Sequence, residues 1–237
     1  MKIGILGNGE VGSAIGKFYE NPLIKDLNKD EIGEQKLDVL NVCIPYSKKF
    51  IDIVFESIKK NKPNLVIVHS TVHPGTTKRI FDKYPKIVHS PIRGIHPYLF
   101  EGVKTFVKFI GADDKKIGII AKEHMEKIGL IIKLVDNSTS TELGKLLDTT
   151  YYGFCIAFHQ FADDLCDKYD VDFEVVMTEF NKTYNEGYAK LGKKNVVRPV
   201  LFSPKKKIGG HCVVSNAEIL KDIADDQSFL DVILKYK

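Results

Sequence analysis

A glycine-rich turn between a buried strand and a helix constrains this chain more than any other feature. Ile3–Leu6 is apolar throughout, as expected for a parallel strand that is covered on both faces. The next six residues have the pattern Gly-x-Gly-x-x-Gly and lead into an amphipathic helical pattern. In that order the first glycine permits a tight turn, the second lets a pyrophosphate approach the backbone, and the third lets helix and strand pack closely. The predicted phosphate-binding residues are Gly7, Asn8, Gly9, Glu10, Val11 and Gly12.

An acidic residue at the end of the second predicted strand indicates which dinucleotide is bound. Asp26 lies 19 residues after Gly7, close to the spacing expected for an acid that holds the ribose. A carboxylate there accepts hydrogen bonds from both ribose hydroxyls and repels a 2′-phosphate. The sequence therefore favours NAD over NADP. The other predicted cofactor contacts follow later strands, at Ile44, Pro45, Ser70 and Thr71.

Short apolar segments alternate with helical patterns in the first part of the chain. This alternation predicts an α/β fold with a Rossmann-type parallel sheet. Strands are expected at Ile3–Leu6, Leu23–Lys25, Val39–Ile44, Leu65–His69, Ile87–His89, Val107–Ile110 and Leu130–Leu134, and helices at Val11–Tyr19, Lys49–Lys60 and Lys115–Lys127.

After Asp136 the pattern becomes helical. One helix is expected to run to about Tyr169, a second from Phe173 to about Glu186, and a last one from about Ala217 to Leu234, after a long loop. The predicted organisation is an NAD-binding domain over residues 1–135, followed by a mostly helical dimerisation and substrate domain over residues 136–237.

Composition and charge argue against several classes of protein. Lysine and arginine number 35 against 31 acids, and this net charge of +4 is too small and too evenly spread to predict binding to nucleic acid or a membrane surface. No apolar run approaches the ~20 residues of a membrane helix, and no signal peptide is recognised. The four cysteines are far apart and form no CxxC pair, so no disulfide framework is expected and the cytoplasm is the expected location. His69/His73 and Cys155/His159 have i,i+4 spacing, but the first pair spans a strand–loop junction and the second lies in the core pattern, so no metal site is expected.

Four further segments resemble motifs of the nucleotide-sugar 6-dehydrogenases, the UDP-glucose/GDP-mannose dehydrogenase family. Ser70–Thr77 (STVHPGTT) resembles the family's STVxPGTT loop, and Ser90–Arg93 (SPIR) resembles its SPER segment. Glu142–Lys145 resembles its AExxK helix, and Arg198–Cys212 resembles the stretch that runs from an arginine to GGHC. The motifs also occur in the family's order. The resemblance implies an enzyme that oxidises a primary alcohol twice, through an aldehyde held on a cysteine, with a helical domain that mediates dimerisation.

The resemblance also implies roles for individual residues. Cys212 would be the nucleophile, and Lys145 would stabilise developing alkoxide charge, with Thr149 one helical turn away. The remaining cysteines, Cys43, Cys155 and Cys166, lie in apolar periodicities and are expected in the core. The full predicted catalytic set is Cys212, Lys145, Thr71, Thr149, Asn216 and His96. An anionic substrate is expected, bound by Arg93, Arg198, Lys205, Lys206, Lys207 and His211.

Several family residues are replaced. The glutamate of SPER is Ile92, a second expected glutamate is His96, the asparagine after the helix lysine is Thr149, and the aspartate after the cysteine is Asn216. Family members are also longer, with a third, nucleotide-binding domain after the cysteine. Because carboxylates that would activate water are missing, His96 is a candidate base. Two alternatives therefore stay open: a catalytically inactive NAD-binding protein, and an enzyme that resembles β-hydroxyacid dehydrogenases.

Aromatic residues on the predicted long helix indicate how the chain assembles. Tyr151, Tyr152, Phe154, Phe158 and Phe161 exceed what one seam of a small domain covers. A homodimer through the helix at Thr141–Tyr169 is therefore expected.

Overall fold

A computed structural model describes residues 1–94, 97–202, 208 and 211–236, and of His211 only the backbone. The chain divides into two compact units, Met1–Lys145 (unit 1) and Leu146–Lys237 (unit 2). The division falls inside the long helix α6 (Ser138–Tyr169), whereas the predicted boundary after residue 135 precedes that helix.

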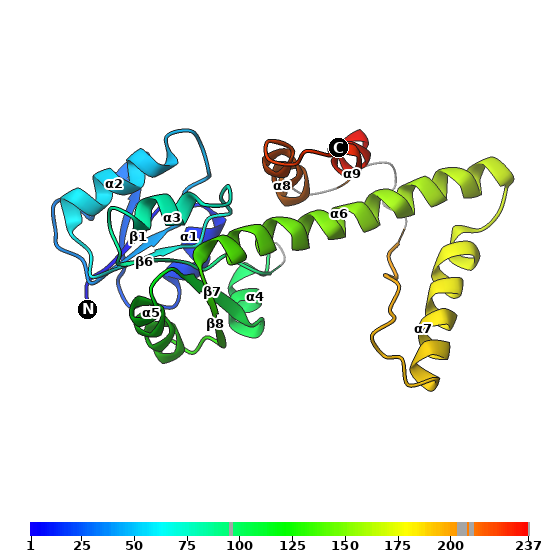
Figure 1. Cartoon of the computed structure of the whole chain (residues 1–237), viewed down its shortest axis with the longest axis horizontal. Coiled ribbons are helices and arrows are strands. Elements are labelled where there is room, and N and C mark those ends of the chain that lie inside the picture. The colour runs from blue at the N-terminus through cyan, green and yellow to red at the C-terminus, as the bar shows by residue number, and fades with distance from the viewer. Residues whose placement is uncertain (95–96, 203–207, 209–210, 237) are drawn as a thin grey trace. The chain divides into compact units, whose positions relative to one another are not determined.

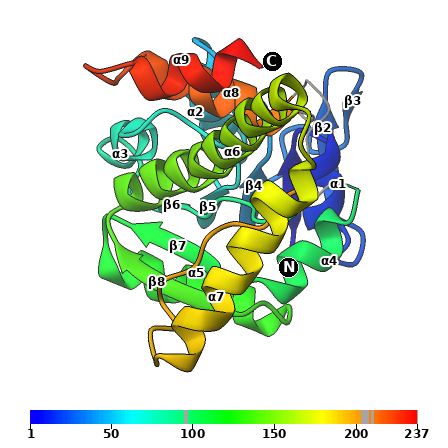
Figure 2. The same cartoon turned by 90° about the vertical axis from the view of Figure 1, so that its right-hand side faces the viewer.

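Unit 1 is built on one sheet (Figure 1), whose described strands lie in the order β3-β2-β1-β4-β5-β6-β7-β8; most of them are labelled in Figure 2. Neighbouring strands are parallel except β2 with β3 and β6 with β7. The strands are β1 (Ile3–Leu6), β2 (Leu23–Asp26), β3 (Lys29–Asp30), β4 (Val39–Val42), β5 (Leu65–Val68), β6 (Ile87–His89), β7 (Lys108–Ala112) and β8 (Ile132–Asp136). The mostly parallel sheet confirms the predicted α/β fold class.

Helices cover both faces of this sheet. On one face α1 (Glu10–Gly16), α4 (Leu99–Thr105) and α5 (Lys115–Lys127) bury side chains such as Ile15 against Ile5 and Ile67. On the other face α2 (Phe50–Asn61) and α3 (Thr76–Phe81) bury Phe50 and Ile80 against alternate residues of the same strands. Two apolar layers on one sheet explain why the central strands read as continuous apolar runs.

Most predicted elements of unit 1 are found within one to three residues of the expected bounds. The two-residue strand β3 and the short helices α3 and α4 were not predicted. One last helix was predicted, whereas the structure has two, α8 (His211–Lys221) and α9 (Ser228–Lys235). The break has a local cause, because the carboxylate of Asp226 accepts a hydrogen bond from the N–H of Ser228 and starts a new helix there.

Unit 2 contains the rest of α6, a π-helical segment η1 (Glu174–Glu179), α7 (Phe180–Lys190), α8 and α9. The pair α8 and α9 lies beside α6 in both views (Figure 1, Figure 2). Leu146 and Ala157 of α6 share an apolar core with Ala217 and Ile233. Gly153 makes this close packing possible, since a Cβ at that position would lie 2.3 Å from Cγ1 of Val213.

A row of apolar side chains runs along an adjacent face of α6 at steps of three and four residues. We call this row the α6 seam: Leu143, Leu147, Tyr151, Phe154, Phe158, Phe161, Leu165 and Tyr169. Apart from the half-buried Phe154, its members are exposed, from 37% at Leu143 to 68% at Tyr169. Among the described helices, none has the length and apolarity that a bilayer crossing requires.

Candidate functional site

The glycine-rich turn has the geometry that a phosphate-binding loop requires. Gly7 has φ +93°, a left-handed conformation that favours glycine. A Cβ at Gly12 would lie 1.8 Å from the carbonyl oxygen of Gly7, so only glycine fits there. A Cβ at Gly9, by contrast, would meet nothing within 4 Å. The backbone at Gly9, at the start of α1, is therefore open to an approaching phosphate.

Asp26 lies beside this turn at the end of β2. Its carboxylate accepts hydrogen bonds from the N–H groups of Asn8 and Leu27. These two bonds, that of Asn8 first, hold the pKa of the exposed Asp26 below its usual range. The carboxylate is therefore ionised at neutral pH and held in position next to the loop.

The loops after β4 and β5 are linked at the same edge of the sheet. The hydroxyl of Ser70, the second residue after β5, donates to the carbonyl of Ile44 at 2.6 Å. Ser70 is buried, and the following Thr71 is half-buried. The bond brings together two predicted cofactor-binding segments, the Ile44–Pro45 turn and the Ser70–Thr71 loop.

Glu142, in the first turns of α6, holds the end of the STVHPGTT loop. Its fully buried carboxylate accepts hydrogen bonds from the N–H of Gly75 at 2.6 Å and of Thr77 at 2.8 Å. Both N–H groups belong to the start of α3, where a carboxylate also complements the helix dipole. Burial nevertheless raises the pKa of Glu142. Glu142 lies in the motif that resembles AExxK, but its role in holding this loop was not predicted from the sequence.

Two buried histidines hold the main chain of the motif loops. His69 lies between the side-chain oxygen of Asn41 and the main-chain oxygen of Ser90, each 3.0 Å from a ring nitrogen. The ring nitrogens of His89 lie 2.8 Å from Oγ1 of Thr141 and 3.1 Å from the carbonyl oxygen of Ser70. Burial lowers the pKa of His69 well below its usual range and that of His89 to about 3. Both rings are therefore neutral at physiological pH.

Lys108, at the start of β7, is a buried ammonium at this edge of the sheet. Its Nζ donates to the carbonyl oxygens of Ser90 at 2.6 Å and Pro91 at 3.1 Å, which belong to the SPIR segment. No carboxylate pairs with it within the described part of unit 1. Burial lowers the pKa of Lys108 to about 7. The nearby Cys43 acts to raise this pKa, and the charge of Lys145 acts to lower it further. Burial also raises the pKa of Cys43 to about 12.

The predicted lysine of α6 lies near this edge. Lys145 is half-buried, three residues after Glu142, and close enough to Lys108 for its charge to lower the pKa of Lys108. The first turns of α6 are tied down by Glu142 and by the hydroxyl of Ser138, which donates to Asp113 at 2.5 Å. Unit 1 thus contains the glycine loop, the Thr71 loop and Lys145.

In unit 2 the predicted nucleophile is accessible. Cys212 is exposed in the first turn of α8, whereas Cys43, Cys155 and Cys166 are buried, as predicted. Asn216, one turn further along α8, is only 3% exposed, and its amide nitrogen has no hydrogen-bond partner among the described residues. Thr149 is half-buried on α6.

Several predicted residues lie outside the described residues: His96, Lys205, Lys206, Lys207 and the side chain of His211. Arg93 is described, and its guanidinium packs near the rings of Phe106 and Phe109, 5.8 and 5.7 Å from their centroids. Across the described positions, no group of three His, Cys, Asp or Glu side chains forms a metal site.

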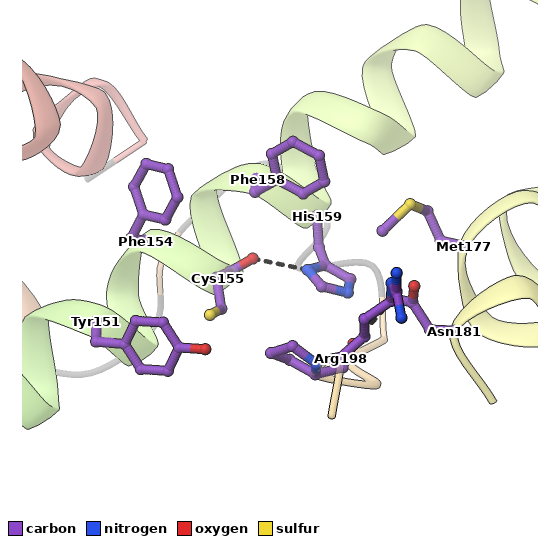
Figure 3. A pocket seen from close by; sticks show the side chains of 9 residues that line it. Tyr151, Phe154, Cys155, Phe158, His159, Met177, Asn181 and Arg198 are labelled. Atoms are coloured by element: carbon purple, nitrogen blue, oxygen red, sulfur yellow. Dashed lines mark hydrogen bonds between the residues drawn. The ribbon is translucent and has the colours of Figure 1, made fainter. Parts of the chain in front are cut away.

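Arg198 lines a cavity within unit 2, between α6, α7 and its own loop (Figure 3). Its guanidinium stacks on Tyr184, 4.1 Å from the ring centroid. Figure 3 shows this side chain between His159 and Asn181. The motif that marked Arg198 in the sequence gave no indication of the cavity.

The sheet and the glycine loop are those of a Rossmann-type fold, and comparison with curated relatives narrows the class of protein. The chain is 24% identical over 223 residues to a UDP-N-acetyl-D-mannosamine dehydrogenase of Methanococcus vannielii, covering 87% of this chain and 49% of that protein. It is 25% identical over 203 residues to the enzyme of the same name from Methanocaldococcus jannaschii, covering 78% and 44%. This chain spans about half the length of the relatives it matches. No family model matches the chain.

Solved structures agree on the fold. The UDP-D-ManNAc dehydrogenase of Pyrococcus horikoshii superposes with a TM-score of 0.80 at 17% identity, covering 100% of this chain and 68% of that one. A 3-hydroxyisobutyrate dehydrogenase of Mycobacterium tuberculosis superposes with a TM-score of 0.69 at 14% identity, covering 99% and 93%. This chain is a homologue of nucleotide-sugar dehydrogenases and corresponds to their N-terminal part, which confirms the resemblance carried by the motifs. The relatives and the solved structures are dehydrogenases by name, in agreement with the predicted nicotinamide cofactor.

Proposed function

We propose that this protein is an NAD-dependent oxidoreductase that oxidises an alcohol group of an anionic substrate. One observation carries the proposal: Glu142 ties the start of α6 to the STVHPGTT loop, so that Lys145 is held at the sheet edge that also carries the glycine loop. In α/β sheets of this kind, ligands bind outside the carboxyl ends of the parallel strands.

The described residues fit NAD. The open backbone at Gly9 and the start of α1 would hold the pyrophosphate, and the ionised Asp26 would accept from the ribose hydroxyls. The linked Ile44 and Ser70 segments would contact the rest of the cofactor. When bound, NAD supplies the hydride acceptor of the reaction.

Lys145 and Cys212 would carry the chemistry on the substrate. The Lys145 ammonium would stabilise negative charge on the substrate oxygen as its proton leaves to a base, with Thr71, Thr149, Asn216 and His96 as the other predicted participants. For a second oxidation, the Cys212 thiolate would add to the aldehyde carbon and form a thiohemiacetal. Loss of a second hydride gives a thioester, which water cleaves to a carboxylate and the free thiol.

The proposed substrate class is a nucleoside-diphosphate sugar. This proposal comes from the relatives' activity and from the predicted cations Arg93, Arg198, Lys205–Lys207 and His211. Cationic groups near a binding site raise the local concentration of an anionic substrate. A cytoplasmic location goes with this proposal, since activated sugars of this kind are made from cytoplasmic nucleotides.

We further propose a homodimer through the α6 seam. Heptad-like spacing over the 32 residues of α6 provides an apolar strip that two antiparallel or crossing copies would bury. A contiguous exposed strip of this length on a single helix is typical of an interaction surface.

The test combines NAD titration with product counting. Purified protein is titrated with NAD by calorimetry and then assayed with UDP-N-acetylmannosamine and UDP-glucose, and the NADH formed per substrate consumed is measured. Two NADH per substrate are expected for the wild type, and about one for Cys212→Ser, which should release aldehyde. Lys145→Met should lose at least about 100-fold in kcat with NAD binding retained. Cys166→Ala removes a buried thiol and serves as the matched control, with unchanged stoichiometry.

Each other outcome has a definite meaning. One NADH per substrate in both wild type and Cys212→Ser would contradict the covalent step and indicate a simple alcohol–carbonyl enzyme centred on Lys145. NAD binding with no turnover of any alcohol on an activated sugar or hydroxy acid would contradict the proposed activity and indicate a binding protein.

A further inference from the structure

The cavity of unit 2 has the properties of a ligand site that is separate from the glycine loop. Its volume is about 370 Å³, within the range of small-molecule sites. Apolar walls come from Phe154, Phe158 and Met177, and polar groups come from His159, Asn181 and Arg198 (Figure 3). All the residues that line it belong to unit 2.

Arg198 is held in place through its backbone, but one nitrogen of its guanidinium has no hydrogen-bond partner among the described residues. Asn185 fixes its backbone from both sides, accepting from the N–H at 2.8 Å and donating to the carbonyl at 2.9 Å. The guanidinium stacks on Tyr184 and lies 5.5 Å from the ring centroid of Tyr188. Its Nη1 is buried and has no hydrogen-bond partner among the described residues. A buried donor on a permanent cation is costly unless an acceptor meets it.

The groups beside Arg198 provide no negative charge. The imidazole of His159 is 3% exposed, and its Nδ1 donates to the carbonyl of Cys155 at 2.7 Å. Asn181 donates its amide N–H to the carbonyl of Pro199 at 3.0 Å and so holds the arginine loop against α7. None of the described residues that line the cavity carries a carboxylate. A guanidinium beside an imidazole, without an acid, favours an anion.

We propose that this cavity binds an organic anion in which a carboxylate, phosphate or sulfonate is attached to a flat apolar body. The anionic group would accept from Nη1 of Arg198, and the flat body would pack against Phe154, Phe158 and Met177. Arg198 is also one of the predicted substrate-binding cations. The proposal therefore rests on the proposed function where the anion belongs to the substrate, and goes beyond it where the anion is a separate regulatory ligand.

The experiment uses two fluorescent probes of nearly the same shape. 8-Anilinonaphthalene-1-sulfonate carries the anion, and N-phenyl-1-naphthylamine lacks it, so their difference isolates the charge from the apolar contact. The full chain is titrated with each probe as wild type, Arg198→Met, Arg198→Lys and Met177→Trp, the last of which fills the cavity. Arg79→Met is the matched control, since it removes an exposed arginine of α3 with the same change of net charge.

Arg198→Met should weaken the sulfonate probe at least tenfold and the neutral probe less than twofold. Arg198→Lys should give an intermediate loss, because a lysine keeps the charge but not the planar fork. Met177→Trp should weaken both probes, and Arg79→Met should weaken neither. Near-ultraviolet circular dichroism checks that each variant is folded.

Equal affinity of the sulfonate probe for wild type, Arg198→Met and Met177→Trp would overturn the proposal, as would equal losses in Arg198→Met and Arg79→Met. Competition then identifies the occupant. The competition needs no turnover of NAD. If a nucleoside-diphosphate sugar displaces the probe, the cavity belongs to the substrate, and if it does not, the cavity belongs to a separate ligand. Either result is independent of whether the protein proves to be a dehydrogenase.

Discussion

The two units differ in how completely they satisfy their own buried groups. In unit 1 the buried side chains of His69, His89, Lys108 and Glu142 all hydrogen-bond to partners within the unit, and among its described residues one buried side-chain atom, Oγ1 of Thr77, has no partner. In unit 2 four buried side-chain atoms of described residues have no partner: Oγ1 of Thr150, Oγ1 of Thr178, Nη1 of Arg198 and Nδ2 of Asn216. Unit 2 also carries most of the exposed α6 seam.

The two units therefore differ in how far hydrogen bonds within the unit fix their loops. Unit 1 fixes its loops with internal bonds, so its edge is prepared before a ligand arrives, which lowers the entropic cost of binding. Each unsatisfied buried group in unit 2 costs about 1–3 kcal/mol. A second copy or a bound anion that met these groups would remove that cost.

The largest expected effect comes from adding one carbon to the glycine loop. In Gly12→Ala the new Cβ would collide with the carbonyl of Gly7, so we expect a loss of at least about 3 kcal/mol in the free energy of unfolding. Gly9→Ala is the matched control, because its Cβ meets nothing in the folded chain. It should unfold at the wild-type temperature but bind NAD at least tenfold more weakly by calorimetry. Wild-type NAD affinity in Gly9→Ala would contradict the assignment of the phosphate loop.

The second-largest expected effect concerns the exposed α6 seam, most of which belongs to unit 2. Phe161→Asp puts a charge in the middle of the α6 seam, where Phe161 is 48% exposed, so we expect the dimer dissociation constant to rise at least 100-fold, about 2.7 kcal/mol. Light scattering should then report a monomer of 26.7 kDa. Phe202→Asp makes the same change at an 83% exposed residue off the seam and should remain a dimer. A wild-type monomer at micromolar concentration would contradict the proposed assembly.

A third prediction tests the buried ammonium of unit 1. Because burial lowers the pKa of Lys108 to about 7, an unfolded chain binds more protons than the folded one above that pH, and stability should rise with pH. Between pH 7 and 9 the rise should total about 2–3 kcal/mol in urea unfolding, at up to about 1.4 kcal/mol per pH unit. Above pH 9 the raised pKa of Cys43 acts in the opposite direction, since unfolding then frees a thiol that ionises.

Lys108→Met is the control for this prediction. The variant keeps the length and most of the volume of the side chain but cannot titrate, so its stability should be nearly flat from pH 7 to 9. Equal slopes in the wild type and the variant would show that Lys108 stays charged in the folded state. Unit 1 would then hold an unpaired cation rather than a neutral amine.

Much of unit 1 could be predicted from the sequence, because its signals are local. Apolar segments such as Val39–Val42 and Leu65–Val68 appear as fully buried strands, and the glycine spacing specifies a backbone turn. The buried partners of the loops were not predicted. Glu142 meets Gly75 across 67 positions of the chain, and no periodicity reports such a contact.

The helical part was predicted less completely for a physical reason. Apolar spacing located α6 to Tyr169 but did not distinguish its two apolar faces, of which Leu146 is fully buried and the neighbouring Leu147 is 52% exposed. Which face is covered depends on helices that are distant in sequence. The cavity at Arg198 likewise requires α6, α7 and a loop together, so only the structure reveals it.

The smallest predicted effect changes cofactor choice without changing the fold. Asp26 is exposed and its oxygens accept from Asn8 and Leu27, yet each carboxylate oxygen has a further lone pair for a ribose hydroxyl. In Asp26→Ser we expect NAD to bind about five- to tenfold more weakly, because a ribose bond is lost, and NADP to bind more tightly, because the repulsion is gone. Since the pKa of Asp26 is lowered, the wild-type preference for NAD should persist from pH 8 down to pH 5, where the carboxylate is still ionised. Asp30→Ser removes a neighbouring carboxylate of β3 and should leave the ratio of the two affinities unchanged, and equal ratios in wild type and Asp26→Ser would show that another group selects the cofactor.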